Sequence, residues 1–258
     1  MSYQTIRFEE TDGIAVVTLD REEVMNALNR AMRAEITEAV TRAAATARVI
    51  VLTGTGRAFC SGQDLGDPAV AGGFDVGRVL AEEYEPMLRA ILAARVPVIA
   101  AVNGAAAGAG ANLALAADVV IAAESASFIQ AFTRIGLIPD AGGTHVLPRT
   151  IGMARALGAA LFADKVSARQ AADWGMIWEA VADDGFEAHW RARAAALAHG
   201  PTEAFARIKT ALRASLGNDL DAQLALEARL QGECGRTADF REGVAAFLAK
   251  RPARFQGR

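Results

Sequence analysis

The stretch from Val96 to Ala117 reads VPVIAAVNGAAAGAGANLALAA and contains no formally charged residue over 22 positions. Such a length could in principle span a bilayer. Five residues that break regular structure interrupt it, however: Pro97, Asn103, Gly104, Gly108 and Gly110. They divide the stretch into a β-branched run, a turn and a small-residue segment. The pattern therefore predicts a buried strand over 98–102 that leads into a buried helix over 111–117, and not a membrane span.

The chain on either side alternates strand-like and helix-like segments as far as about residue 195. Strands are expected at 6–9, 14–19, 49–54 and 119–122, and helices after the capping residue Asn29 and over 79–92. The Asp12-Gly13 pair between the first two runs predicts a hairpin. Alternation of this kind favours an α/β core in which most strands pair in parallel.

The C-terminal part has a different pattern. From Gly185 onward it is almost wholly helical, with breaks at Gly200-Pro201, Gly217-Asn218 and Gly235. We expect two parts: a core over residues 1–195 that carries the site, and a helical region over residues 196–258. These helices would cover the core or pack against a neighbouring subunit.

Composition limits the class of function. The 258 residues are 52% hydrophobic, which allows a sizeable core and excludes a disordered chain. A formal net charge of −3 gives no field for binding nucleic-acid backbones. Two cysteines, Cys60 and Cys234, are too few for a disulfide framework, and no apolar leader precedes the first strand. We therefore expect a cytoplasmic protein.

Several familiar sites are missing from the sequence. It has no G-x-x-x-x-G-K-[ST] loop, and Leu113 stands where a dinucleotide-binding turn has its third glycine. The three histidines lack the spacing of metal ligands: His145, His189 and His199. Cys60-Ser61-Gly62 is not a G-x-S-x-G elbow, although a covalent hydrolase that uses His145 stays open. We expect no metal and no bound cofactor.

Two predicted strand-to-helix turns, over 54–65 and 103–112, are rich in glycine and other small residues. Free backbone N–H groups at such turns can hold a developing oxyanion, although glycines also serve merely to turn the chain. A third segment, 136–144, carries one acid, Asp140, after an apolar tripeptide. In a partly dry cleft the pKa of Asp140 would rise toward that of a general base. The alternative is that Asp140 caps the helix containing His145 and Val146.

Three motifs together resemble those of the crotonase, or enoyl-CoA hydratase/isomerase, superfamily. They are Phe59–Leu65 (FCSGQDL), Pro97–Gly104 (PVIAAVNG) and Gly142–Thr144 (GGT). The resemblance covers essentially the full length of the chain. It implies a spiral core of β-β-α turns, a C-terminal helical region that forms trimers or hexamers, and an oxyanion hole for a coenzyme A thioester. Mapped onto this sequence, the donors would be the backbone N–H groups of Ser61 and Ala109.

One departure from the family pattern bears on the reaction. Hydratases of this superfamily have glutamates at the positions of Asn112 and Phe132, so hydration would lack its acid and its base. Three further motifs resemble the phenylacetate-pathway isomerases: Gly136–Asp140, Trp174–Trp178, and Arg241–Val244 with Phe255–Arg258. Those enzymes convert ring-1,2-epoxyphenylacetyl-CoA to the oxepin thioester and can shift Δ3 to Δ2 double bonds. In them an aspartate at the position of Asp140 carries the proton.

The same likeness suggests which residues bind the substrate, whose coenzyme A portion makes a separate cofactor unnecessary. The candidates are Val24, Met25, Asn26, Arg57, Ser61, Gly62, Gln63, Asp64, Leu65, Gly108, Asn112, Phe132, Phe255 and Arg258, the last from a neighbouring subunit. The loop over 66–78 and Phe132 would set the width of the acyl pocket. Two other functions stay open: a fatty-acid enoyl-CoA hydratase or isomerase, and a non-catalytic acyl-CoA-binding protein. No nucleic-acid or membrane partner is expected.

Overall fold

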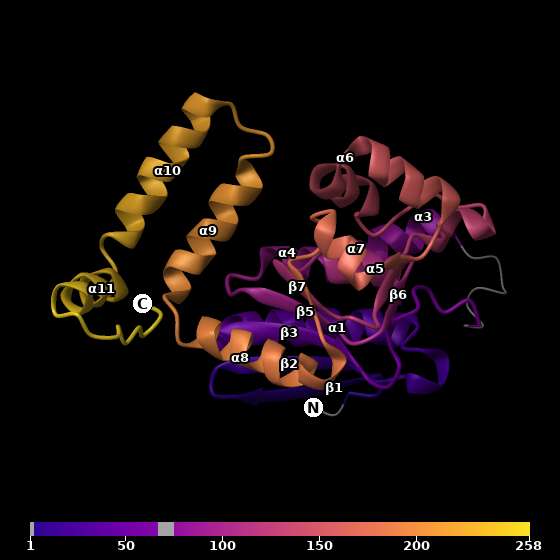
Figure 1. Ribbon diagram of the computed structural model, residues 1–258, viewed down its shortest axis with the longest axis horizontal. Coiled ribbons are helices and arrows are strands. Elements are labelled where there is room, and N and C mark those ends of the chain that lie inside the picture. Colours follow the sequence, from indigo (N-terminus) through magenta and orange to yellow (C-terminus); the bar gives the residue numbers. More distant parts are fainter. Residues whose placement is uncertain (1–2, 67–74) are drawn as a thin grey trace.

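The computed structural model describes residues 3–66 and 75–258, and its centre is a six-stranded sheet (Figure 1). The strand order is β1 (Ile6–Thr11), β2 (Ile14–Leu19), β3 (Val49–Gly54), β5 (Val98–Val102), β7 (Val119–Ala123) and β10 (Glu179–Val181). β1 and β2 form the predicted hairpin, in which Asp12 and Gly13 both have positive φ. All other neighbours pair in parallel. The predicted α/β core is confirmed.

A second, four-stranded sheet follows the first along the chain. Its order is β4 (Ala58–Cys60), β6 (Ala105–Ala107), β8 (Ser127–Ile129) and β9 (Val166–Ser167), with β9 antiparallel to β8. β4, β6 and β8 come directly after β3, β5 and β7, so each turn of the chain contributes one strand to each sheet before a helix returns it. This repetition is the expected spiral of β-β-α turns.

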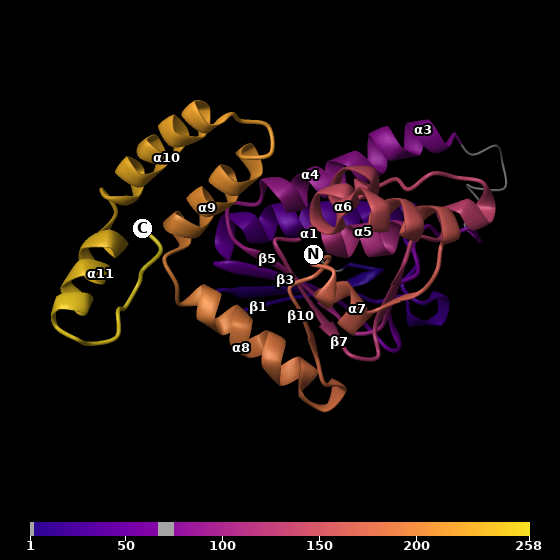
Figure 2. The ribbon, with the colours of Figure 1, turned by 45° about the horizontal axis from the view of Figure 1, so that its top comes forward.

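Helices cover both faces of the six-stranded sheet (Figures 1 and 2). Those of the core are α1 (Arg30–Thr46), α3 (Val76–Val79), α4 (Glu85–Ala93), α5 (Ala109–Leu115), α6 (Gly143–Phe162), α7 (Ala168–Asp173) and α8 (Phe186–Ala198). Short turns precede or join them: η1 (Glu22–Val24), the π-helical η2 (Leu80–Tyr84), η3 (Ala131–Ile135) and η4 (Asp183–Gly185). Asn29 caps α1 as predicted, through its Oδ1 and the Met32 N–H at 2.8 Å. The helix predicted over 79–92 is found as a continuous helical run over 76–93, in which the turn η2 between α3 and α4 is π-helical.

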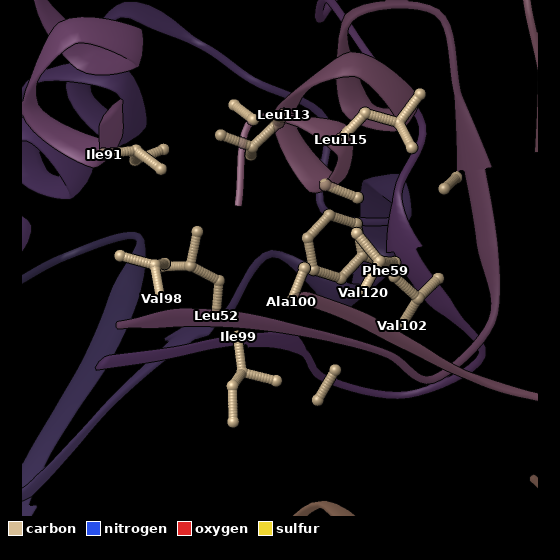
Figure 3. Packing of buried hydrophobic residues seen from close by; sticks show 14 of the residues in the cluster. Leu52, Phe59, Ile91, Val98, Ile99, Ala100, Val102, Leu113, Leu115 and Val120 are labelled. Carbon is tan, nitrogen blue, oxygen red and sulfur yellow. The ribbon is translucent and has the colours of Figure 1, made fainter. Parts of the chain in front are cut away.

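The uncharged stretch over 96–117 lies at the centre of the molecule. Every residue of β5 and of α5 is buried. Figure 3 shows the alternation of β5: Val98 and Ala100 face Ile91 and Leu113 of the covering helices, and Ile99 points to the opposite face. In the described part of the chain, no helix combines the length and the apolar character that crossing a bilayer requires.

Three helices, α9 (Thr202–Ala214), α10 (Leu220–Cys234) and α11 (Ala238–Leu248), extend away from the core (Figures 1 and 2). The predicted breaks at 200–201, 217–218 and 235 all fall between helices. The division between core and helical region that we expected after residue 195 falls inside α8. This helix packs on the six-stranded sheet and ends at Ala198. Leu212, Leu220 and Phe247 of this region are exposed by 66%, 71% and 82%. Its role in oligomerisation stays a prediction.

Candidate active site

The two glycine-rich turns pack directly against each other. A Cβ atom at Gly104 or at Gly110 would collide with the carbonyl oxygen of Arg57 or of Cys60, respectively. Gly62 has a φ of +96°, and a Cβ there would lie 2.8 Å from the carbonyl oxygen of Ala107. The structure shows that three of these glycines let the backbones of the two turns touch.

The prediction that Ser61 supplies an oxyanion donor is wrong. Its N–H donates to the carbonyl oxygen of Met25 at 3.0 Å, and its hydroxyl donates to that of Val24 at 3.2 Å. Ser61 is therefore held by the 24–26 segment. The Gly62 N–H interacts with the Cys60 thiol, whose pKa burial raises to about 12.

The free donor of the first turn belongs to Gln63. No residue in the described ranges accepts a hydrogen bond from its backbone N–H. The carbonyl oxygen of Gly62, in the same peptide group, accepts from the Leu28 N–H at 2.7 Å. Because the C=O and N–H of a trans peptide point in opposite directions, the Gln63 N–H points away from Leu28. The segment over 24–28, which accepts a hydrogen bond from the Ser61 N–H, therefore leaves the Gln63 N–H without an acceptor.

Ala109 supplies the corresponding group on the second turn. It is the first residue of α5, and within residues 3–66 and 75–258 nothing accepts from its N–H. Its nitrogen would lie 3.5 Å from a Cβ at Gly62, which places it beside the first turn. Two unoccupied N–H groups, those of Gln63 and Ala109, therefore lie on adjoining turns.

Both turns border one cavity of about 590 Å³. Its described lining comprises Ser61, Gly62, Gln63, Leu65, Val76, Val79, Leu80, Tyr84, Gly108, Ala109, Ala131, Phe132, Arg134, Ile135, Leu137 and Asp140. The walls are largely apolar, and Asp140 is the one carboxylate among these residues. Residues 67–74 of the loop expected to set the pocket width lie outside the described residues. The cavity is thus lined by one acid, by the two residues that carry the free N–H groups, and by apolar side chains.

Asp140 lies in the loop between η3 and α6. Its carbonyl oxygen accepts from the Gly143 N–H and from Asn112 Nδ2, both at 2.8 Å. Its Oδ1 is buried and has no hydrogen-bond partner among the described residues. Burial raises the pKa of this carboxyl to about 6. The capping alternative is wrong, because Gly142 occupies the N-cap of α6 and no side chain caps that end.

Asn112, Asn26 and Asp64 serve the scaffold of the site. Asn112 is 2% exposed and does not line the cavity, so its predicted contact with substrate is wrong; its Oδ1 accepts from Gln130 at 2.9 Å. Asn26 is completely buried, and its side chain is hydrogen-bonded to the backbone of residues 21, 55 and 58. Its predicted substrate contact is wrong for the same reason. Asp64 pairs with Arg21 at 2.8 Å.

The remaining predicted contacts lie outside the cavity. Its described lining residues do not include Val24, Met25 or Arg57. Phe255 and Arg258 lie in the C-terminal segment that follows α11 in the sequence. Their proposed contacts with coenzyme A stay predictions. Tyr84 and Arg134 line the cavity but were not predicted, since nothing in their sequence neighbourhood separates them from ordinary helix and turn residues. No group of three metal-ligating side chains occurs in the described ranges, and His189 pairs with Glu179 at 2.8 Å.

Comparison with known proteins covers the whole chain. The family model described as Enoyl-CoA hydratase/isomerase matches residues 9–258. A Rhodobacter capsulatus protein named "Probable enoyl-CoA hydratase" is 69% identical over 258 residues, 100% of both chains. The 1,2-epoxyphenylacetyl-CoA isomerase of Escherichia coli is 47% identical over 251 residues, covering 95% of this chain and 96% of the relative. An enoyl-CoA hydratase structure from Bacillus anthracis is 33% identical, with a TM-score of 0.93 over 99% of this chain and 100% of that one. The fold expected from the motifs is confirmed by this superposition.

Proposed function

The chain belongs to the enoyl-CoA hydratase/isomerase family, and on this premise we propose that it isomerises a coenzyme A thioester with Asp140 as the proton carrier. One observation carries the proposal: Asp140 is the single carboxylate among the described residues that line the cavity. A reaction that moves one proton from one carbon to another needs one base that can also act as an acid.

In the proposed mechanism the thioester carbonyl oxygen accepts from the N–H groups of Gln63 and Ala109. The Asp140 carboxylate removes a proton from the acyl chain, and the electron pair of the broken C–H bond delocalises onto the carbonyl oxygen. The protonated Asp140 then returns the proton at a different carbon as the carbonyl reforms. Each well-placed donor would stabilise the transition state by about 2.7–4 kcal/mol. Proton transfer by Asp140 would contribute a factor of about 10²–10⁴.

The surroundings of Asp140 suit this task. A pKa of about 6 leaves the carboxyl mostly ionised at neutral pH while keeping it a stronger base than an exposed aspartate. The apolar walls around it keep water away from the carbanion-like intermediate. These two properties both come from the burial of the loop between η3 and α6.

Two positions argue against efficient hydration, although the Rhodobacter capsulatus relative and the Bacillus anthracis structure both carry hydratase names. Hydratases that the sequence resembles have glutamates where this chain has Asn112 and Phe132. The Asn112 side chain is occupied by the Asp140 carbonyl oxygen and by Gln130. Phe132 is 5% exposed and gives the cavity an apolar wall. Nothing at either position can activate a water molecule.

The substrate that we favour is an aromatic or unsaturated acyl thioester. The 47% identical relative is named for 1,2-epoxyphenylacetyl-CoA, and the apolar walls that include Leu80, Ile135 and Leu137 suit a ring or a short aliphatic chain. We propose ring-1,2-epoxyphenylacetyl-CoA, converted to the oxepin thioester, or a Δ3-enoyl-CoA, converted to the Δ2 form.

A spectrophotometric screen of three thioesters tests the proposal. Epoxyphenylacetyl-CoA, a 3-enoyl-CoA and crotonyl-CoA are supplied to the wild type and to Asp140→Asn. We expect turnover of one or both of the first two, loss of that turnover in the variant, and slow hydration of crotonyl-CoA. Hydration that rivals isomerisation would overturn the proposal. Binding of all three without turnover would identify a non-catalytic acyl-CoA-binding protein.

A further inference from the structure

A buried cation that the proposed mechanism does not use contacts the first glycine-rich turn, which carries the Gln63 N–H. Arg33 of α1 is 2% exposed. Its Nη1 donates to the carbonyl oxygen of Leu28 and to Oε1 of Gln63, both at 2.8 Å. Its Nε and Nη2 donate to Glu83 at 3.0 and 2.6 Å. All three nitrogens of this guanidinium are therefore hydrogen-bonded.

Tyr84 completes the arrangement from the cavity wall. Its hydroxyl donates to the same Oε1 of Gln63 at 2.8 Å, and its ring lies under the Arg33 guanidinium, 4.8 Å from it. Glu83 and Tyr84 are adjacent in the π-helical turn η2, and both contact Arg33. Because π-helical turns are rare and concentrate at functional sites, this local break in the helix merits a functional explanation.

The hydrogen bonds of Arg33 reach the peptide group that carries the free N–H. The Leu28 N–H donates to the Gly62 carbonyl oxygen at 2.7 Å, and the Asp64 N–H donates to the Leu28 carbonyl oxygen at 3.1 Å. Arg33 binds that same Leu28 oxygen and also the Gln63 side chain. Arg33 thus contacts the first turn in two ways: through Leu28, which pairs with its backbone, and through the side chain of Gln63. Rotation of the 62–63 peptide would break these contacts.

We propose that Arg33, with the Tyr84 hydroxyl, is a positioning residue that keeps the Gln63 N–H aimed at the thioester oxygen. Lysine cannot replace it, because only the planar guanidinium binds Leu28, Gln63 and Glu83 together. The inference rests on the proposed use of the Gln63 N–H, but not on whether the reaction is isomerisation or hydration.

The test measures carbonyl polarisation and turnover separately. The probe is phenylacetyl-CoA with a ¹³C-labelled carbonyl, a thioester with no double bond to isomerise or hydrate. Infrared difference spectra give the downshift of its C=O stretch on binding, which reports hydrogen bonding to that oxygen. The variants are Arg33→Lys, Gln63→Met and Tyr84→Phe. Arg207→Lys is the matched control, because Arg207 pairs with Glu203 and Glu233 within the C-terminal helices α9 and α10.

For Arg33→Lys we expect a reduced downshift and a kcat lowered by about 10²-fold, the loss typical of a group displaced by roughly 1 Å. KM should change little, because a hydrogen bond to the carbonyl oxygen strengthens as negative charge develops there in the transition state. Gln63→Met keeps both the N–H and the Arg33–Glu83 pair, and it should lower kcat by about tenfold, as should Tyr84→Phe. Arg207→Lys should lower the melting temperature alone. Should Arg33→Lys fail to fold, the other two variants decide.

Two results would overturn the proposal. The first is that the wild type shows the C=O downshift and that all three variants, Arg33→Lys, Gln63→Met and Tyr84→Phe, keep both the same downshift and the wild-type kcat. The other is the absence of any downshift in the wild type, which would remove the oxyanion hole itself. If the wild type shows the downshift but hydrates crotonyl-CoA rapidly, isomerisation is refuted while the role of Arg33 is still decided by the variants.

Discussion

Replacing Asp140 by asparagine should stabilise the protein while it abolishes turnover. The carboxyl has a pKa of about 6 in the folded chain against an ordinary value of 3.8. Between these two values the folded protein binds more protons than the unfolded chain, so stability falls as the pH rises through that window. Above it, the folded state carries the full cost of a buried charge. Asparagine, which is neutral and of the same shape, removes that cost.

The size of the gain follows from the shift. About two pKa units correspond to about 3 kcal/mol at 1.36 kcal/mol per unit. The carboxyl is only half-buried, and screening by water reduces this to about 1–2 kcal/mol. The free energy of unfolding of Asp140→Asn should therefore exceed that of the wild type by about 1–2 kcal/mol near pH 8, and the difference should close as the pH falls toward 4. Turnover should fall by at least about 10²-fold.

Urea denaturation at several pH values and one protein concentration measures the difference directly. Asp118→Asn is a control of opposite sign, because Asp118 pairs with Lys209 and Arg213, each at 2.7 Å, and its neutralisation should destabilise the fold. The wild-type rate should rise with pH to a plateau above about pH 6, as Asp140 ionises. This account of Asp140 would be refuted if Asp140→Asn were less stable than the wild type near pH 8, or if the difference in their free energies of unfolding did not change with pH.

Other parts of the site give three further predictions. Asn112→Ala removes one of the two hydrogen bonds to the Asp140 carbonyl oxygen and leaves the Gln130 Nε2 without its acceptor, so it should lower stability by about 1–3 kcal/mol and lower kcat while changing KM little, in contrast to a purely structural loss. Gly62→Ala places a Cβ 2.8 Å from the Ala107 oxygen at a φ of +96°, so it should separate the two turns and weaken the thioester C=O downshift. Sedimentation should show a trimer or hexamer, and a monomer at micromolar concentration would contradict the interface role of the C-terminal helices.

The parts of the fold that are encoded locally were predictable. The hairpin at Asp12-Gly13, the cap at Asn29 and the helix breaks after Gly200 each depend on a few adjacent residues. The second sheet was not predicted, because strands such as Ala105–Ala107 are three residues long and have no alternation to detect. Their pairing is decided by neighbours far along the chain. The π-helical turn over 80–84 was not predicted for a similar reason, since its contacts with residues distant in the sequence include those with α1.

The site shows the same division more sharply. The sequence indicated both turns and Asp140, which are marked by glycine and by an isolated acid. It did not identify the donor within the first turn, because the two candidates differ in whether a backbone carbonyl accepts from their N–H: Met25 accepts from Ser61, and none of the described residues accepts from Gln63. Residues 24–28, some 35 positions earlier in the chain, determine which of the two N–H groups is left without an acceptor. Sequence spacing along the turn carries no information about it.

The loop of Asp140 has costs that packing alone does not explain. Its Oδ1 is buried without a partner in the described structure, and the next residue, Ala141, has a φ of +47°, which is unfavourable for a residue with a side chain. The Asn112 side chain, which accepts a hydrogen bond from Gln130, donates to this strained loop from the core. A loop that served only to connect η3 with α6 would gain stability by turning the carboxyl to solvent. Its retention in the cavity is therefore best explained by a reaction that requires an unpaired base there.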